Sequence, residues 1–168
     1  MNRNISIVLS ASALIFGVLL PREEVVAQTA KDLVGTWTLV SITLEQDGKK
    51  TGMYGTNPQG QATFDPNRRF SIVLIRSDVP KFASTNREAG TSEENKAAVQ
   101  GSIAYFGTYS VSETDNVIMY HLEGSTWPNW RGVDQKRIFK LSGNDFTYTN
   151  PSSSTGSGNV YVVWKRAN

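Results

Sequence analysis

The 168-residue chain contains a single histidine, His121, which stands two positions before Glu123. Residues two apart on a β-strand point to the same face, so an imidazole and a carboxylate would lie side by side there. A histidine steered by a carboxylate is typical of general acid/base catalysis. Gln135 and Arg137 have the same spacing and would share a face of another strand. These four residues therefore form a candidate polar cluster.

Alternation along residues 135–141 indicates which of its side chains face the protein interior. Lys136 and Lys140 share one face of this segment, and two lysines do not suit a narrow apolar interior. The opposite face is therefore expected to point inward, and it carries Gln135, Arg137, Phe139 and Leu141. Because a buried guanidinium requires an acceptor, Arg137 should have an anionic or polar partner nearby.

The neighbouring segment, residues 117–123, could supply that partner. Hydrophobicity alone favours an inner face made of Ile118, Tyr120 and Leu122. The need to pair Arg137 favours the other face, which carries Val117, Met119, His121 and Glu123. We expect this second face to point inward, with Glu123 as the partner of Arg137.

The expected cluster of His121, Glu123, Gln135 and Arg137 has three interpretations. In the first interpretation, the cluster is a satisfied hydrogen-bond network that fixes the register of the strands. Alternatively, it is a polar anchor at the base of an apolar pocket and orients a ligand carbonyl or carboxylate. In the third, His121 is a general acid/base and Arg137 stabilises developing negative charge, as in an isomerase or cyclase.

Other chemistries lack their residues. The chain has no cysteine and only one histidine, which excludes thiolate catalysis and a site with several cysteine or histidine zinc ligands. His-Glu-x-x-His and Gly-x-Ser-x-Gly motifs are absent as well. With 17 Lys+Arg and 15 Asp+Glu the net charge is +2, and the basic residues are scattered, which argues against nucleic-acid binding. We expect no metal and no cofactor.

The elements that must position these residues are mainly β-strands. Eight segments have strand character and most are joined by short turn signals such as Asp47-Gly48 and Ser142-Gly143-Asn144. Eight such strands in meander order predict an antiparallel up-and-down barrel, in which no strand edge is left exposed. The expected strands are residues 37–44, 61–64, 70–75, 105–112, 117–123, 135–141, 145–149 and 159–165.

One segment interrupts the meander between the third and fourth expected strands. Residues 77–90 are irregular, and Thr91-Ser92-Glu93-Glu94 predicts a capping box that opens one short helix. An insertion of this size is either a lid over the barrel mouth or a plug that supports one end.

The first 27 residues have the pattern of a secretory signal peptide. Arg3 precedes an uncharged, mostly apolar run over residues 5–20. The small residues Val25-Val26-Ala27 are typical of a signal-peptide cleavage site. We expect cleavage after Ala27, one domain over residues 28–168, a periplasmic or secreted location, and no membrane insertion after cleavage. The apolar run is short for a membrane-spanning helix.

Several ordered stretches of this chain resemble a known family. Gly35-Thr36-Trp37 is similar to the Gly-x-Trp element of lipocalins, and Arg166 stands where their late-strand arginine packs across that tryptophan. Residues 33–41, 105–109, 121–125, 128–130 and 134–137 resemble the bacterial and fungal lipocalin-like domain proteins. The resemblance implies a small β-barrel, closed at one end by Trp37 and Arg166, that holds an apolar ligand.

We therefore expect an exported lipocalin-like barrel that binds a small hydrophobic molecule, with binding favoured over catalysis. A structural barrel with a filled core is the other alternative to the His121 enzyme. Trp130 belongs to a loop that either seals the barrel or lines its mouth, and Tyr109 is expected to point inward. The candidate ligand-binding residues are Tyr109, Met119, His121, Glu123, Trp130, Gln135, Arg137 and Phe139.

Overall fold

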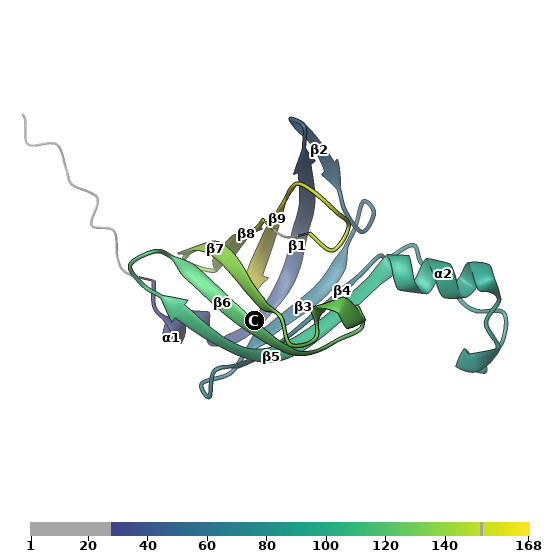
Figure 1. Cartoon of the computed structure of the whole chain (residues 1–168), viewed down its shortest axis with the longest axis horizontal. Coiled ribbons are helices and arrows are strands. Elements are labelled where there is room, and N and C mark those ends of the chain that lie inside the picture. Colours follow the sequence, from purple (N-terminus) through teal and green to yellow (C-terminus); the bar gives the residue numbers. More distant parts are fainter. Residues whose placement is uncertain (1–27, 152) are drawn as a thin grey trace, which may run out of the picture.

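A computed structural model describes residues 28–151 and 153–168. Their strands form one continuous antiparallel sheet that closes on itself (Figure 1). The strand order is β2-β1-β3-β4-β5-β6-β7-β8-β9, and β1 also pairs with β9. The strands are β1 (Gly35–Gln46), β2 (Lys49–Gly52), β3 (Gln59–Phe64), β4 (Arg69–Ile75), β5 (Ser102–Ser112), β6 (Val117–Ser125), β7 (Asp134–Ser142), β8 (Asp145–Asn150) and β9 (Asn159–Arg166).

The predicted eight-stranded barrel is confirmed, with one strand added. The short strand β2 forms a hairpin with the end of β1, where Thr43 pairs with Gly52, and it lies outside the closed ring. Sequence analysis missed it because its four residues, Lys49–Gly52, are polar and exposed. The predicted helix was placed between the third and fourth strands; with the extra strand counted, it lies between β4 and β5. The predicted signal peptide, residues 1–27, lies outside the described residues.

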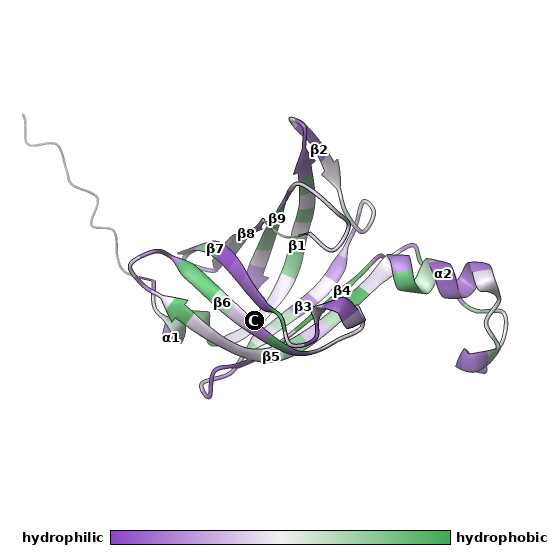
Figure 2. Ribbon diagram, in the orientation of Figure 1, coloured by the Kyte–Doolittle hydropathy of each residue, from purple (hydrophilic) through white to green (hydrophobic). Residues whose placement is uncertain are grey.

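Alternation of buried and exposed residues along the strands explains why these segments form a barrel. In β4 every second residue is buried, from Phe70 through Ile72 to Leu74, while the residues between them are exposed. Figure 2 shows the same change of hydropathy along several strands. A sheet that curves around its apolar face buries that face inside the barrel, and closure also removes the unpaired edges of the strands in the ring.

We call the end of the barrel that carries helix α1 (Ala30–Leu33) the closed end. Trp37 is fully buried there, and its indole nitrogen donates to the carbonyl of Leu33 at 2.9 Å. The guanidinium carbon of Arg166 lies 4.1 Å from the centre of the Trp37 ring. Arg166 also donates to the carbonyls of Val34 at 2.9 Å and Asp32 at 2.7 Å. These contacts fasten α1 across the opening.

The opposite end, called the mouth end, is bordered by the loop after β2, by the 3-10 helix η2 (Pro128–Trp130) and by the last turn of helix α2 (Ser92–Gly101). The predicted capping box is present, because Thr91 accepts from the amide of Glu94 while the Glu94 carboxylate accepts from the amide of Thr91. A second 3-10 helix, η1 (Arg87–Ala89), precedes it. In Figure 1, α2 projects beyond the barrel instead of folding over its mouth. Within residues 28–151 and 153–168, no helix has the length and apolar character required to span a membrane.

Candidate functional site

The interior differs between the two ends of the barrel. Towards the closed end it is filled by aromatic rings that pack against one another. The ring centre of Phe146 lies 5.8 Å from that of Phe64 and 5.3 Å from that of Trp37. Towards the mouth end there is a cavity of about 30 Å³, which is room for about one water molecule. Its walls are mainly apolar, with some polar groups: Ile42, Met53, Tyr54, Leu74, Ile103, Tyr105, Trp130, Tyr148, Asn150, Ser153, Ser154, Val160 and Val162.

An outer groove of about 380 Å³ lies next to this cavity on the surface of the mouth end. Val99 and Trp127 line it and are 71% and 40% exposed, so apolar surface faces solvent here. Tyr54, Ile103 and Ser154 line both the groove and the inner cavity. These three residues therefore form the wall between the two spaces.

Tyr54 has two unusual properties for a wall residue. Its backbone has a φ of 59°, in the left-handed region that bulky residues rarely adopt. Burial and, to a smaller extent, the proximity of Tyr105 together raise the pKa of its phenol to about 12. The phenol therefore stays neutral at physiological pH and remains a hydrogen-bond donor.

Arg137 lies deeper in the interior and is 1% exposed, as the alternation along residues 135–141 predicted. One terminal nitrogen donates to the carbonyl of Lys136 at 2.9 Å, and the other donates to the side-chain oxygen of Gln135. Its Nε has no hydrogen-bond partner in residues 28–151 and 153–168. Within the described residues no carboxylate pairs with it. An unpaired buried charge of this kind costs several kcal/mol, in round terms.

Two tyrosine rings supply part of the missing compensation. The guanidinium carbon of Arg137 lies 5.5 Å from the ring centre of Tyr120 and 5.8 Å from that of Tyr148. Each such cation–π contact contributes about 0.5–2 kcal/mol, which is less than a buried carboxylate would provide. Tyr148 also lines the cavity, so its ring lies beside both the cavity and the guanidinium.

Tyr120 carries a second unpaired polar group. Its side chain is fully buried, and its hydroxyl has no hydrogen-bond partner in the part of the chain that the structure describes. Burial raises the pKa of Tyr120 well above its usual value, and the charge of Arg137 opposes that shift. Burial also raises the pKa of Tyr148. Both phenols are therefore neutral donors beside a cation.

The prediction that Met119, His121 and Glu123 face inward is wrong. After Val117, which is buried at the start of β6, the buried residues are Ile118, Tyr120 and Leu122, whereas Met119, His121 and Glu123 are exposed on the outer surface. Three apolar or aromatic side chains gain more from burial than the pairing of one arginine, so hydrophobicity decided the orientation. Met119, His121 and Glu123 therefore do not line the interior site.

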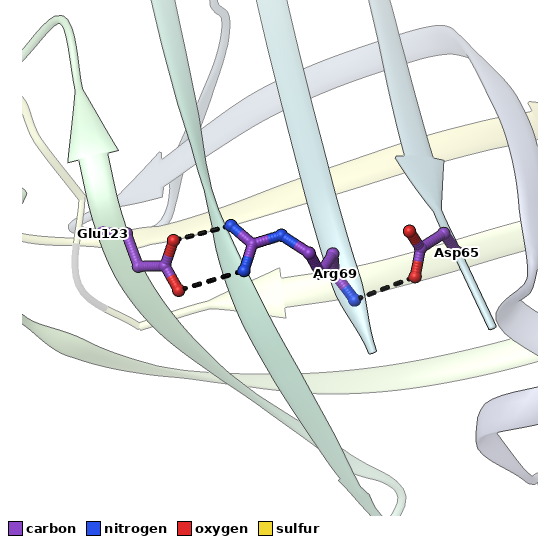
Figure 3. A network of polar contacts seen from close by, with 3 residues as sticks. All are labelled: Asp65, Arg69 and Glu123. Carbon is purple, nitrogen blue, oxygen red and sulfur yellow. Dashed lines mark hydrogen bonds and ion pairs between the residues drawn. The ribbon is translucent and has the colours of Figure 1, made fainter. Parts of the chain in front are cut away.

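On the outer surface, Glu123 has a different arginine as its partner. Arg69 of β4 donates to both carboxylate oxygens of Glu123, at 2.6 Å and 3.3 Å (Figure 3). These bonds from Arg69 lower the pKa of Glu123. Asp65 accepts from the backbone amide of Arg69 at 3.2 Å and so helps to orient it. The pair spans β5, which lies between β4 and β6.

His121 is equally remote from the interior. Its Nδ1 lies 2.7 Å from Asp134, which stands opposite it in the β6–β7 ladder, and both side chains are more than half exposed. A carboxylate does orient the imidazole, but the pair faces solvent. An acid/base mechanism in the barrel through His121 is therefore contradicted by the position of the ring.

The remaining sequence-predicted residues are distributed along the interior. Gln135 is buried beside Arg137, and Trp130 lines the cavity with its ring 5.3 Å from that of Tyr105. Phe139 is buried nearer the closed end, against Phe146. Tyr109 is also buried, but its hydroxyl donates to the carbonyl of Asp65 at 3.2 Å, so it is a satisfied core residue.

Sequence reasoning missed the tyrosines that surround the cavity and the arginine. Tyr54, Tyr120 and Tyr148 were not singled out as site residues, although alternation with the buried residues Phe146 and Asn150 could have placed Tyr148 inside. No local pattern could have identified Tyr54, because it belongs to an irregular loop after β2. Its role depends on which residues the barrel brings to the mouth.

Comparison with known proteins agrees with this architecture. Residues 34–167 match the family described as lipocalin-like domain, which is most of the chain. The chain is also similar to a curated fungal protein, the 4'-hydroxy-3'-methoxypropiophenone carrier protein ppsC of Aspergillus oryzae (strain ATCC 42149 / RIB 40). The two are 29% identical over 105 residues, which cover 57% of this chain and 95% of that protein.

Proposed function

Because the chain belongs to the lipocalin-like domain family, we propose that it binds one small, mainly apolar aromatic molecule in the mouth half of the barrel. The observation that carries the proposal is the thin wall between the inner cavity and the outer groove, formed by Tyr54, Ile103 and Ser154. Displacement of these side chains would join the two spaces. The rings of Tyr105, Tyr148 and Trp130 would then face an aromatic ligand from several sides.

The size of the cavity requires such a displacement. Sites for small organic ligands have volumes of roughly 300–1,000 Å³. The inner cavity has about 30 Å³, whereas the adjoining groove has about 380 Å³. We propose Tyr54 as the residue that moves, because its left-handed backbone stores strain that a rearrangement of the loop can release.

The similar fungal protein supports the ligand class. It is named as the carrier of 4'-hydroxy-3'-methoxypropiophenone, a small aromatic ketone, and nearly its whole length aligns with this chain. A molecule of that kind has a flat ring for the aromatic walls and oxygen atoms for the buried donors. We propose a ligand of similar size and aromatic character for this protein.

One observation favours a different function, that of a structural barrel with a filled core. The inner cavity is small, and aromatic rings occupy the interior towards the closed end. Such a barrel would bind nothing inside. The exposed apolar side chains of Val99 and Trp127 in the groove argue for the binding function, because exposed apolar surface gathered at one place marks a contact site.

Isothermal titration calorimetry with 4'-hydroxy-3'-methoxypropiophenone tests the proposal. We expect saturable binding of one molecule per chain. Ser154→Trp places an indole in the wall and should weaken binding at least tenfold. Ser110→Trp, on the exposed outer face of β5, is the matched control and should leave binding unchanged.

Native mass spectrometry of protein purified from its own host supplies a second test, which does not depend on the choice of ligand. A discrete additional mass that disappears on denaturation supports the proposed function. If the protein carries no additional mass and also shows no saturable binding of the ketone, the filled barrel is the correct description.

We also propose that the chain is exported and that its mature form begins at Gln28. What supports this boundary is that Gln28 already belongs to the folded domain. Its side chain donates to the carbonyl of Leu141 at 3.3 Å and accepts from the amide of Leu141 at 2.9 Å. Mass analysis of the N-terminal peptide from the exported fraction is expected to find Gln28 first. A chain that keeps residues 1–27 contradicts the proposal.

A further inference from the structure

The charge balance of the barrel interior is incomplete. Of the residues that the structure describes, Arg137 is the one charged side chain among those that are buried. The other buried polar side chains are Gln135 and Asn150, which are neutral amides. The described residues therefore place one positive charge in the interior and no negative charge to balance it.

The hydrogen bonds of Arg137 leave part of its donor capacity unused. Its terminal nitrogens donate to two neutral oxygens, the backbone carbonyl of Lys136 and the side chain of Gln135. Its Nε–H has no partner. A guanidinium offers its donors in a planar arrangement that matches a carboxylate, and in this position no carboxylate of the described chain meets it.

The unpaired hydroxyl of Tyr120 lies in the same part of the interior. Tyr120 pairs with Gln135 across the β6–β7 ladder, and its ring lies 5.5 Å from the guanidinium carbon of Arg137. Its buried O–H has no acceptor among the residues that the structure describes. Two unused donors beside one uncompensated cation are the complement of an anion with more than one acceptor oxygen.

We propose that the interior site takes a small aromatic monoanion, and that the ligand's carboxylate pairs with Arg137 and accepts a hydrogen bond from Tyr120. This inference rests on the proposed function, because the ligand would reach the guanidinium from the mouth cavity. Tyr148 lines that cavity, and its ring centre lies 5.8 Å from the guanidinium carbon. A displacement of this ring would connect the cavity with the guanidinium. The single buried cation limits the ligand to one negative charge.

A pair of probes with the same shape and different charge tests this inference. We would titrate the protein with 3-phenylpropionate and with 3-phenylpropanamide by isothermal titration calorimetry at pH 7. The wild-type protein is expected to bind the carboxylate at least tenfold more tightly than the amide. This comparison needs no variant and therefore does not depend on how substitutions fold.

Two substitutions then locate the preference. Arg137→Gln removes the charge and should bring the affinities for the two probes to within twofold of each other, mainly by weakening the carboxylate. Arg137→Lys keeps the charge and should keep the preference. If both variants retain the full preference for the carboxylate, another cation is responsible and the inference is wrong.

The outcomes separate this inference from the proposed function. Equal binding of the two probes, or tighter binding of the amide, overturns the anionic ligand and leaves small-molecule binding intact. Binding of neither probe overturns the anionic ligand, while the ketone titration and native mass spectrometry still decide the proposed function. If sodium chloride raises the melting temperature as much as 3-phenylpropionate at equal concentration, the site holds a simple inorganic anion and the aromatic class is wrong.

Discussion

An arginine lies against aromatic rings in each half of the barrel, and the two are satisfied to different degrees. At the closed end, both terminal nitrogens of Arg166 donate to carbonyls of the chain segment around α1, and the guanidinium lies 4.1 Å from the ring centre of Trp37. In the mouth half, Arg137 has an unpaired Nε and two rings at 5.5 Å and 5.8 Å. Both arginines donate through their two terminal nitrogens; among the described residues the buried Nε of Arg137 has no partner, whereas no buried donor of Arg166 is left unpaired.

On the proposal that Arg137 binds a ligand, this difference separates an arginine that holds the fold together from one that binds a ligand. A residue that holds the fold together has its donors satisfied by the chain itself, because any unused donor would lower stability. A residue kept for a ligand retains donors that the chain does not use. Local sequence does not reveal the difference, since both arginines belong to strands and both have aromatic neighbours. The predictions below test the contrast, in order of expected effect.

The largest effect is expected at the closed end. Trp37→Ala removes a fully buried indole and the surface on which Arg166 lies, so the free energy of unfolding should fall by about 3–5 kcal/mol. Urea denaturation measures the change. Trp127→Ala, at a position 40% exposed, is the control and should cost less than about 1 kcal/mol. Equal losses in the two variants would mean that Trp37 does not close the barrel.

Substitution of the satisfied arginine should have the next largest effect. Arg166→Met loses two hydrogen bonds to backbone carbonyls and one cation–π contact, which predicts a loss of about 1–3 kcal/mol in the free energy of unfolding. The exposed neighbour gives the control, Lys165→Met, with a change within about 0.5 kcal/mol.

Substitution of the unsatisfied arginine should act in the opposite direction. Arg137→Met replaces an uncompensated buried charge by an apolar side chain, so stability should stay the same or rise by up to about 2 kcal/mol. Glu123 is not left unpaired by this change, because Arg69 is its partner. Lys136→Met is the control on the exposed face of β7. A loss as large as that of Arg166→Met would remove the contrast between the two ends.

Alkaline pH should reveal the buried phenols of the mouth half. The folded state raises the pKa of Tyr54 from 10 to about 12, so it holds the phenol proton more tightly than the unfolded chain does. The stabilisation is therefore complete below pH 10 and is lost as pH rises from 10 to 12. Burial shifts the pKa of Tyr120 and Tyr148 in the same direction. Tyr54→Phe should flatten the decline in the free energy of unfolding between pH 10 and 12, and an unchanged slope contradicts the prediction.

The smallest effect is expected for the residue that first suggested catalysis. His121→Ala should leave the affinity for 4'-hydroxy-3'-methoxypropiophenone within twofold of the wild type, because the imidazole lies on the outer surface beside Asp134. The same calorimetric titration measures it. A loss comparable to that of Ser154→Trp would return His121 to the binding site.

The predictable part of the site follows from alternation along a single strand. Gln135, Arg137 and Phe139 are buried because exposed lysines fix the outer face of β7. The unpredictable part depends on pairing between strands. Glu123 meets Arg69 because β4 and β6 both flank β5, and a bulge between Phe106 and Gly107 shifts the register there. No spacing within β6 contains that information.

The barrel, its closure and the start of helix α2 could be predicted from the sequence. Period-two hydropathy, turn residues and the Thr91 capping box are local signals that act through a few neighbouring residues, whereas the Trp37–Arg166 pair joins the first and last strands and was predicted from the family resemblance. Which carboxylate meets which arginine, and which tyrosines surround the cavity, follow from the tertiary structure. Those choices depend on side chains from several strands competing for one interior, where apolar burial prevails over the pairing of a single charge.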